Sequence, residues 1–311
     1  MHKRFVNHCT IDLSLIPVAP LLVKSGKEGA DPTKPDMEFV ETYRNGQQTI
    51  YLPGSSLKGA IRAHAERIAR TVGKDTRPSA SENNKLWAND PLNDDYKYLE
   101  KKQSHEIYAL SSFTDRIFGN TSIASRFRIE DAYPTSSIKL EERNGVAIDR
   151  VFGSVAVGPF NYQVCTEGEF RTKIHIKNFT LAQIALIGLV LRDLNEGWFG
   201  LGFAKSRGLG TVEVKLNSAV VSYPGCMIDD GKIQLLGSDK SWPINKLLGA
   251  GMFLENNPYH FPENDEVDVA PGAKEMDLGF GVQLSWEGVE QVEDLFIKAM
   301  PKWKTLLGVA A

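Results

Sequence analysis

The stretch Tyr51-Leu-Pro-Gly-Ser-Ser-Leu-Lys-Gly-Ala-Ile-Arg62 combines the end of a strand, a tight turn and the start of a helix. Pro53-Gly54 is typical of a turn. Ser55 or Ser56 then offers a side-chain oxygen to cap the first free N–H groups of a helix. A helix N-terminus attracts anions, so this turn is a place where a phosphate group can bind.

The helix after this turn is predicted by hydrophobic spacing. Apolar residues recur every three or four positions and define one buried face: Leu57, Ile61, Ala65, Ile68 and Val72. Lys58 and Arg62 lie off that face, where their charges would attract a phosphate. The same residues also fit an ordinary capped amphipathic helix without a ligand. His64 lies near the apolar face, and we expect it to have a buried structural role rather than a catalytic one.

Composition and charge limit the classes of function. At 311 residues, with 42% hydrophobic and 24% charged residues, the chain has the composition of an ordinary soluble globular protein with a large core. Its formal net charge is −3, but residues 229–311 contain 14 acidic residues, 7 lysines and no arginine. Their net charge of −7 leaves +4 for residues 1–228. The acidic part is a poor surface for a polyanion, so we expect any nucleic-acid contact in the first part.

Cysteine usage and hydropathy predict a cytoplasmic protein. Cys9, Cys165 and Cys226 are too few and too widely spaced for a disulfide scaffold. The first residues lack the pattern of a signal peptide, and no run of about 18 apolar residues is present to span a membrane. We expect no association with a membrane.

The order of the predicted elements indicates the fold. A strand at residues 5–15 is followed by a loop at 25–36 and by a hairpin closed at Asn45-Gly46, which leads into the turn and helix described above. The remaining elements are a polar insertion at 73–112 with a short helix at 96–103, a strand at 125–132, a protruding hairpin at about 138–164, a strand at 169–176, a helix at 180–195 and a strand at 211–216. This order predicts an α+β, ferredoxin-like βαββαβ core over 1–216, the architecture of RNA-recognition domains. Residues 217–311 are expected to form a C-terminal extension that packs on the core or on a neighbouring subunit.

A second glycine-rich stretch, Gly200-Leu-Gly-Phe-Ala-Lys-Ser-Arg-Gly-Leu-Gly210, lies between the second helix and the last strand. A dinucleotide-binding fingerprint follows a strand and opens a helix, so this stretch is not one. Its four glycines allow close approach of the backbone to a ligand, and Lys205 and Arg207 add positive charge. A chain of phosphates suits such a loop, although a tight connection between helix and strand would also explain it.

Together, the Leu52–Gly59 and Gly200–Gly210 segments resemble the two glycine motifs of the RAMP superfamily (repeat-associated mysterious proteins) of CRISPR systems. The most similar pattern is that of the backbone subunit of type III effector complexes. Three further stretches also match its features. Ile117-Phe-Gly119 matches the segment before the second core strand, and Val146-Ala-Ile-Asp-Arg150 matches the base of a thumb hairpin. Asp36-Met-Glu-Phe-Val40 matches the loop with the RNA-cleaving aspartate. The resemblance covers roughly residues 5–216.

The resemblance implies a subunit that stacks along a CRISPR RNA guide, holds the guide–target duplex and inserts its thumb at regular intervals. The implied partners are the guide, the target RNA, other RAMP subunits and the large subunit of the complex. The residues expected to contact RNA by this resemblance are Ser55, Ser56, Lys58, Arg62, Arg126, Arg128, Arg150, Lys205 and Arg207. The glycines expected to allow close approach of RNA are Gly54, Gly59, Gly200, Gly202, Gly208 and Gly210.

For catalysis, the resemblance implies Asp36, with Asp31 as the alternative in the same loop. RNA is cleaved by in-line attack of its own 2′-hydroxyl, and a carboxylate can accept a proton or hold a divalent ion. Mg²⁺ is the implied ion, and Arg150 of the thumb is a candidate general acid. The alternatives are a non-cleaving structural or capping RAMP subunit and a ribonuclease that processes precursor CRISPR RNA.

Related subunits often hold a structural zinc ion in the insertion before Phe118-Gly119. In this chain, Ser112 and Asp115 stand where the second cysteine pair would be, and no cysteine lies between Cys9 and Cys165. We therefore predict no structural zinc, since the thiolate ligands are missing.

Overall fold

The computed structural model describes residues 4–26, 35–79, 86–92 and 96–308. Its main sheet is antiparallel and has the strand order β15-β16-β9-β1-β8-β4, with β5 also paired to β8. The strands are β1 (His8–Pro17), β4 (Phe127–Ile129), β5 (Tyr133–Pro134), β8 (Phe170–Lys177), β9 (Val212–Tyr223), β15 (Lys274–Glu275) and β16 (Val282–Glu287). The order β9-β1-β8-β4 is that of a ferredoxin-like sheet, so the predicted fold is confirmed.

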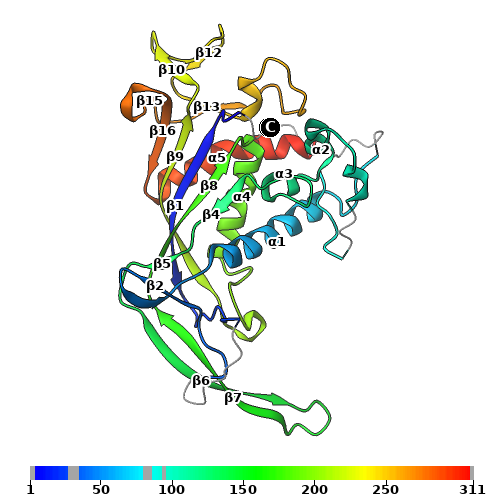
Figure 1. Ribbon diagram of the computed structural model, residues 1–311, viewed down its shortest axis with the longest axis vertical. Coiled ribbons are helices and arrows are strands. Elements are labelled where there is room, and N and C mark those ends of the chain that lie inside the picture. Colours follow the sequence, from blue (N-terminus) through cyan, green and yellow to red (C-terminus); the bar gives the residue numbers. More distant parts are fainter. Residues whose placement is uncertain (1–3, 27–34, 80–85, 93–95, 309–311) are drawn as a thin grey trace.

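Three long helices, α1 (Gly54–Val72), α4 (Leu181–Asn195) and α5 (Val289–Leu306), lie on one side of this sheet (Figure 1). Strand β8 shows why only one side is covered. Its apolar residues alternate with basic ones, and the apolar side chains of Phe170, Ile174 and Ile176 are buried. The alternate residues of β8 face the side that no described helix covers, and we call this side the open face.

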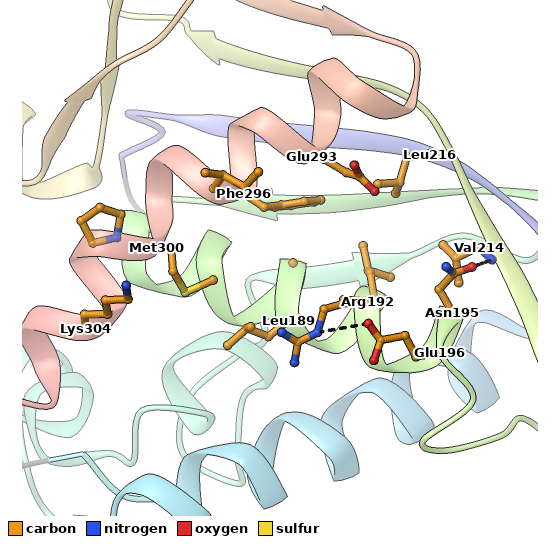
Figure 2. Close-up of a pocket in the computed structure, with 14 residues that line it drawn as sticks. Leu189, Arg192, Asn195, Glu196, Val214, Leu216, Glu293, Phe296, Met300 and Lys304 are labelled. Carbon is orange, nitrogen blue, oxygen red and sulfur yellow. Dashed lines mark hydrogen bonds and ion pairs between the residues drawn. The ribbon is translucent and has the colours of Figure 1, made fainter. Parts of the chain in front are cut away.

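Helix α4 is apolar on almost all sides because it lies between the sheet, α1 and α5. Its N-terminus is at the predicted place, where the Thr180 backbone N–H donates to Gln183 Oε1 at 3.1 Å. Gly188 lets α5 approach, since a Cβ atom there would lie 2.5 Å from Cγ of Phe296. Between the two helices runs a largely apolar groove of about 510 Å³, with Arg192, Glu196, Glu293 and Lys304 at its polar parts (Figure 2).

The predicted thumb is a long hairpin of β6 (Lys139–Ile148) and β7 (Val155–Glu167), which extends away from the sheet (Figure 1). Its tip carries exposed apolar side chains, among them Val151 and Phe152. The smaller predicted hairpin is also present, with β2 (Glu41–Arg44) and β3 (Gln47–Ile50) joined at Asn45-Gly46, where both residues have positive φ.

The C-terminal extension continues the fold. Strand β9 runs through residue 216, and β16 pairs with it along its outer edge, while α5 packs on α4. The rest of the extension consists of β10 (Cys226–Asp229), β11 (Lys232–Leu235), β12 (Ser241–Pro243), β13 (Lys246–Leu248), β14 (Glu266–Asp268) and the 3-10 turns η3 (Ala250–Phe253) and η4 (Asp277–Gly279).

The insertion between α1 and β4 contains the 3-10 turn η1 (Lys97–Leu99) and the helices α2 (Ser104–Leu110) and α3 (Asp115–Phe118). The predicted helix at 96–103 is thus only a single turn, and α2 begins after it. The centre of this region is the buried carboxylate of Asp115. It accepts hydrogen bonds from Arg62 Nη2 at 3.0 Å and from Asn89 Nδ2 at 2.9 Å, while its backbone N–H donates to Ser112 Oγ.

Candidate RNA-binding surface

Helix α1 begins two residues earlier than a cap at Ser55 requires, and three residues earlier than a cap at Ser56 requires. Its first residue is Gly54 and its N-cap is Pro53, with no side-chain cap from Ser55 or Ser56. The cap comes from a distant carboxylate instead, since Gly54 N–H donates to Asp131 Oδ1 at 2.7 Å. A Cβ atom at residue 54 would lie 2.4 Å from the carbonyl oxygen of Ile129, so a glycine is required there for packing against the strand. The serine-cap prediction was wrong, and both serines are exposed in the first turn.

We expect Asp131→Ala to lower the free energy of unfolding by about 1 kcal/mol, because it leaves an N-terminal N–H group without its acceptor. Asp131→Asn keeps a side-chain oxygen and should lose less than half of that amount. Urea denaturation of the two variants measures the difference. Equal stability of the alanine variant and the wild type would contradict the capping role.

The two cations of α1 that were predicted to contact RNA are partly engaged by the protein itself. Lys58 Nζ donates to Ser125 Oγ at 2.9 Å, and burial, followed by the charge of Arg62, lowers the pKa of Lys58. Arg62 pairs with Glu66 at 2.7 Å and with Asp115 at 3.0 Å, and donates to the carbonyl of Gly119 at 2.9 Å. Arg62 therefore fixes the insertion onto α1, a role that the sequence did not predict. Gly59 is exposed with open space around it.

The glycine-rich loop is shaped mainly by its own packing. Gly202 and Gly210 have positive φ, and a Cβ atom on either would lie 2.2 or 2.1 Å from a backbone carbonyl oxygen. Gly200 packs closely on Gly210. For these three glycines, the contacts favour the interpretation that the loop is a tight connection between a helix and a strand. Gly208, also with positive φ, instead faces open space.

The outer surface of the same loop carries the two predicted cations. Lys205 and Arg207 lie in the 3-10 turn η2 (Lys205–Arg207) and both are exposed. The guanidinium of Arg207 lies 5.0 Å from the ring centroid of Phe203. The loop thus presents two positive charges and the backbone of Gly208 to solvent, which is an arrangement that suits a phosphate chain.

His64 connects α1 to the start of this loop. Its Nε2 lies 2.7 Å from Asp193 Oδ2, and its ring stacks on Phe199 with centroids 4.3 Å apart. The side chain is buried, so the predicted structural role is confirmed.

The two arginines near the second core strand differ in their surroundings. Arg126 is only 2% exposed, and its guanidinium donates to the Asn178 carbonyl at 2.8 Å and to the Tyr108 hydroxyl at 3.2 Å. Its guanidinium is therefore bonded within the protein instead of being exposed for a phosphate, contrary to the prediction. Arg128 is exposed on the open face and pairs with Glu130 at 2.9 Å.

Asp36 lies beside the middle of β7, where the exposed part of the thumb leaves the body of the domain, and we call this point the thumb base. Its Oδ2 accepts a hydrogen bond from the backbone N–H of Asn161 in β7 at 2.8 Å, and Met37 forms a bridge with Tyr162. The residue is exposed, so the carboxylate faces solvent beside the hairpin. The alternative, Asp31, lies outside the described residues.

The candidate general acid, Arg150, does not share this site. It lies in the turn at the thumb tip, beyond the start of β7 at Val155. Asn161 lies six positions after Val155, which is roughly 20 Å along a strand. Within one chain, Arg150 therefore lies too far from Asp36 to act on the same phosphate.

One surface feature had no signal in the sequence. The guanidinium of Arg44 lies 4.0 Å from the centroid of the Tyr133 ring, and Tyr51 stacks on that ring at 5.8 Å. Guanidinium and aromatic planes are surfaces on which nucleobases stack. The column lies just before the α1 turn, and its members come together only through the fold.

The fold and this surface define a class of protein: a ferredoxin-like α+β domain with a thumb, whose α1 turn, glycine-rich loop and thumb base expose groups suited to RNA. The family model of the RAMP superfamily matches residues 15–213. The chain belongs to the RAMP superfamily, and this membership supports a CRISPR-associated, RNA-binding role. No curated protein matches the chain. Among the described residues, no helix has the length and apolar character needed to cross a membrane.

Proposed function

We propose that the chain is a backbone subunit of a type III CRISPR effector complex, which holds the guide–target duplex and cleaves target RNA with Asp36. The observation that carries the proposal is the hydrogen bond between Asp36 and the thumb strand. It holds a solvent-facing carboxylate at the base of the thumb, which projects far from the sheet (Figure 1). RNA bent around a projecting hairpin would present a distorted phosphodiester near that base.

In such a site, Asp36 has two chemical roles open to it. Its carboxylate can accept the proton of the attacking 2′-hydroxyl, or it can orient groups around the phosphate. The hydrogen bond from Asn161 engages Oδ2 and restrains the orientation of the carboxylate, so Oδ1 would be the oxygen that acts on the substrate.

Mg²⁺ fits this site only together with RNA. Among the described residues, no group of three or more His, Cys, Asp or Glu side chains is placed to hold a metal ion. Mg²⁺ commonly binds through one or two carboxylates plus phosphate oxygens and water. Asp36 would hold the ion beside the target phosphate, where it would supply charge stabilisation. The test is cleavage of target RNA by the reconstituted complex, with and without Mg²⁺, using wild-type and Asp36→Ala chains.

The glycine-rich loop gives a separate prediction on guide binding. We expect the double variant Lys205→Ala/Arg207→Ala to bind guide RNA more weakly and with a shallower salt dependence. Each lost phosphate contact should reduce the slope of log K against log salt by about 0.7. A filter-binding series over salt concentration measures the slope. Lys298→Ala/Lys304→Ala, which removes two exposed charges from α5, is the matched control and should leave the slope unchanged.

A further inference from the structure

The open face of the sheet is polar and carries a cluster of side chains, of which the resemblance implied only Arg128 as an RNA contact. On the central strands β1 and β8, His8 lies opposite Lys177 and Thr10 opposite His175. On the other side of β8, Arg128 of β4 lies opposite His175. We call His8, His175, Arg128, Lys177 and Glu130 the open-face cluster.

The aromatic part of the cluster is a stack of rings. The His8 and His175 rings have centroids 5.5 Å apart and planes within 5° of each other. Phe5 adds a third ring, 5.4 Å from His8 and tilted, and about half of this residue is exposed. Rings on the central strands of an RNA-recognition sheet are the groups on which single-stranded bases stack.

The polar part of the cluster fixes the stack and supplies charge. Glu130 Oε1 lies 2.9 Å from His175 Nε2 and accepts a hydrogen bond from Arg128 Nη2 at 2.9 Å. Thr10 Oγ1 lies 3.3 Å from the other ring nitrogen of His175, so both nitrogens have partners and the ring is held in place. Lys177 is exposed and forms no ion pair within the described part of the chain.

A cavity of about 630 Å³ lies beside the stack, large enough for one base. Its lining residues are His8, Ser125, Arg126, Phe127, Arg128, His175 and Lys177. Burial, followed by the charges of His175, Arg128 and Lys177, lowers the pKa of His8 to about 4. His8 is therefore neutral at pH 7 and offers an uncharged ring face next to two cations.

A contact between α1 and the lining of the cavity indicates which ligand reaches the cavity. Ser125 lines it and also accepts the hydrogen bond from Lys58, which lies in the second turn of α1. A nucleic-acid strand that passes the α1 turn would therefore meet this cavity at the edge of β4.

We propose that the open-face cluster binds one nucleotide of single-stranded RNA, with the base against the His8–His175 stack and the phosphate on Arg128 and Lys177. Glu130 would accept a hydrogen bond from an amino or imino group of that base. This is a second RNA-binding site, on the side of the sheet opposite to the helices.

The test uses the full chain and a short single-stranded RNA that carries photoreactive thiouridine. Affinity is measured by fluorescence anisotropy, and the crosslinked peptides are mapped by mass spectrometry. We expect His8→Ala to lose about tenfold in affinity, since it removes a stacking surface, and His8→Phe to retain binding. Lys177→Ala should weaken binding several-fold, whereas Lys215→Ala, an exposed lysine of β9, should not.

Crosslinks at residues 5–8, 125–128 and 175–177 are expected. The proposal is overturned if His8→Ala and Lys177→Ala bind the RNA as tightly as the wild type does, or if His8→Phe binds it as weakly as His8→Ala. It is also overturned if another subunit crosslinks to this face in the assembled complex. Lys177→Ala changes only an exposed side chain, so it remains a valid test if His8→Ala fails to fold.

The loop variant Lys205→Ala/Arg207→Ala in the same assay separates the two proposals. Loss of guide binding there, with no effect of the open-face variants, would leave the proposed function standing without this site.

Discussion

Asp36→Ala is expected to slow target-RNA cleavage by the assembled complex by about 100-fold or more, while RNA binding stays within about twofold of the wild type. A positioned acid or base contributes about 10²–10⁴ to a rate, and the variant removes that group entirely. Binding should persist because Asp36 lies at the thumb base and carries a negative charge, which does not attract RNA. Product analysis on a gel, with affinity measured in parallel, checks both parts.

Asp36→Asn is the sharper variant for the same position. Its side-chain oxygen can still accept the hydrogen bond from Asn161, so the loop should keep its conformation while the charge is lost. The same loss of cleavage as in Asp36→Ala would show that the carboxylate itself is needed. Glu142→Gln removes an exposed carboxylate from the thumb and should cleave normally. Full cleavage by Asp36→Asn would instead favour a non-cleaving structural subunit, or a role for Asp31.

The second large effect is expected on stability. Asp115→Ala should lower the free energy of unfolding by about 3 kcal/mol, because it leaves Arg62 and Asn89 without the acceptor that they share. The Asp115 carboxylate is buried, whereas the Arg62 side chain is 31% exposed, so solvent screening keeps the effect at the lower end for a broken ion pair. Chemical denaturation measures the change.

Asp115→Asn is the control, since it keeps hydrogen-bonding groups but loses the ion pair, and it should cost less than Asp115→Ala. We also expect limited proteolysis to cut the insertion faster in the alanine variant, because Arg62 and Asn89 connect α1 to that region through this carboxylate. Unchanged stability and unchanged proteolysis would show that ordinary packing alone holds the insertion.

Much of the fold could be predicted because it depends on local patterns. The period-2 alternation of residues 169–176 and the three-to-four spacing after Pro53 each report a face that must be buried. The thumb could be predicted for the opposite reason, since residues 138–164 contain little that could form a core. Helix α2 was missed because it is short and its N-terminal cap comes from Gln103 and Glu106 rather than from a serine or an aspartate.

The candidate site was predicted less well, since side-chain partners far apart in sequence decide it. Arg126 and Arg128 are two residues apart, which suggests one common face. However, β4 begins only at Phe127, and Arg126 turns towards Tyr108 and Asn178. Likewise, the cap of α1 comes from Asp131, 77 residues away, so no local rule could identify it.

The pairing of β16 with β9 has a consequence for how the chain avoids unwanted association. A four-stranded sheet that ended at β9 would expose a long row of unpaired backbone groups, to which a strand of another molecule could add. Strand β16 occupies that row, and the outermost strand is then β15, which has only two residues, Lys274 and Glu275. Short, charged outer strands discourage further strand addition. The extension therefore covers the β9 edge of the sheet, and β15 in turn covers Val282 and Gln283 of β16, which discourages edge-to-edge aggregation on this side.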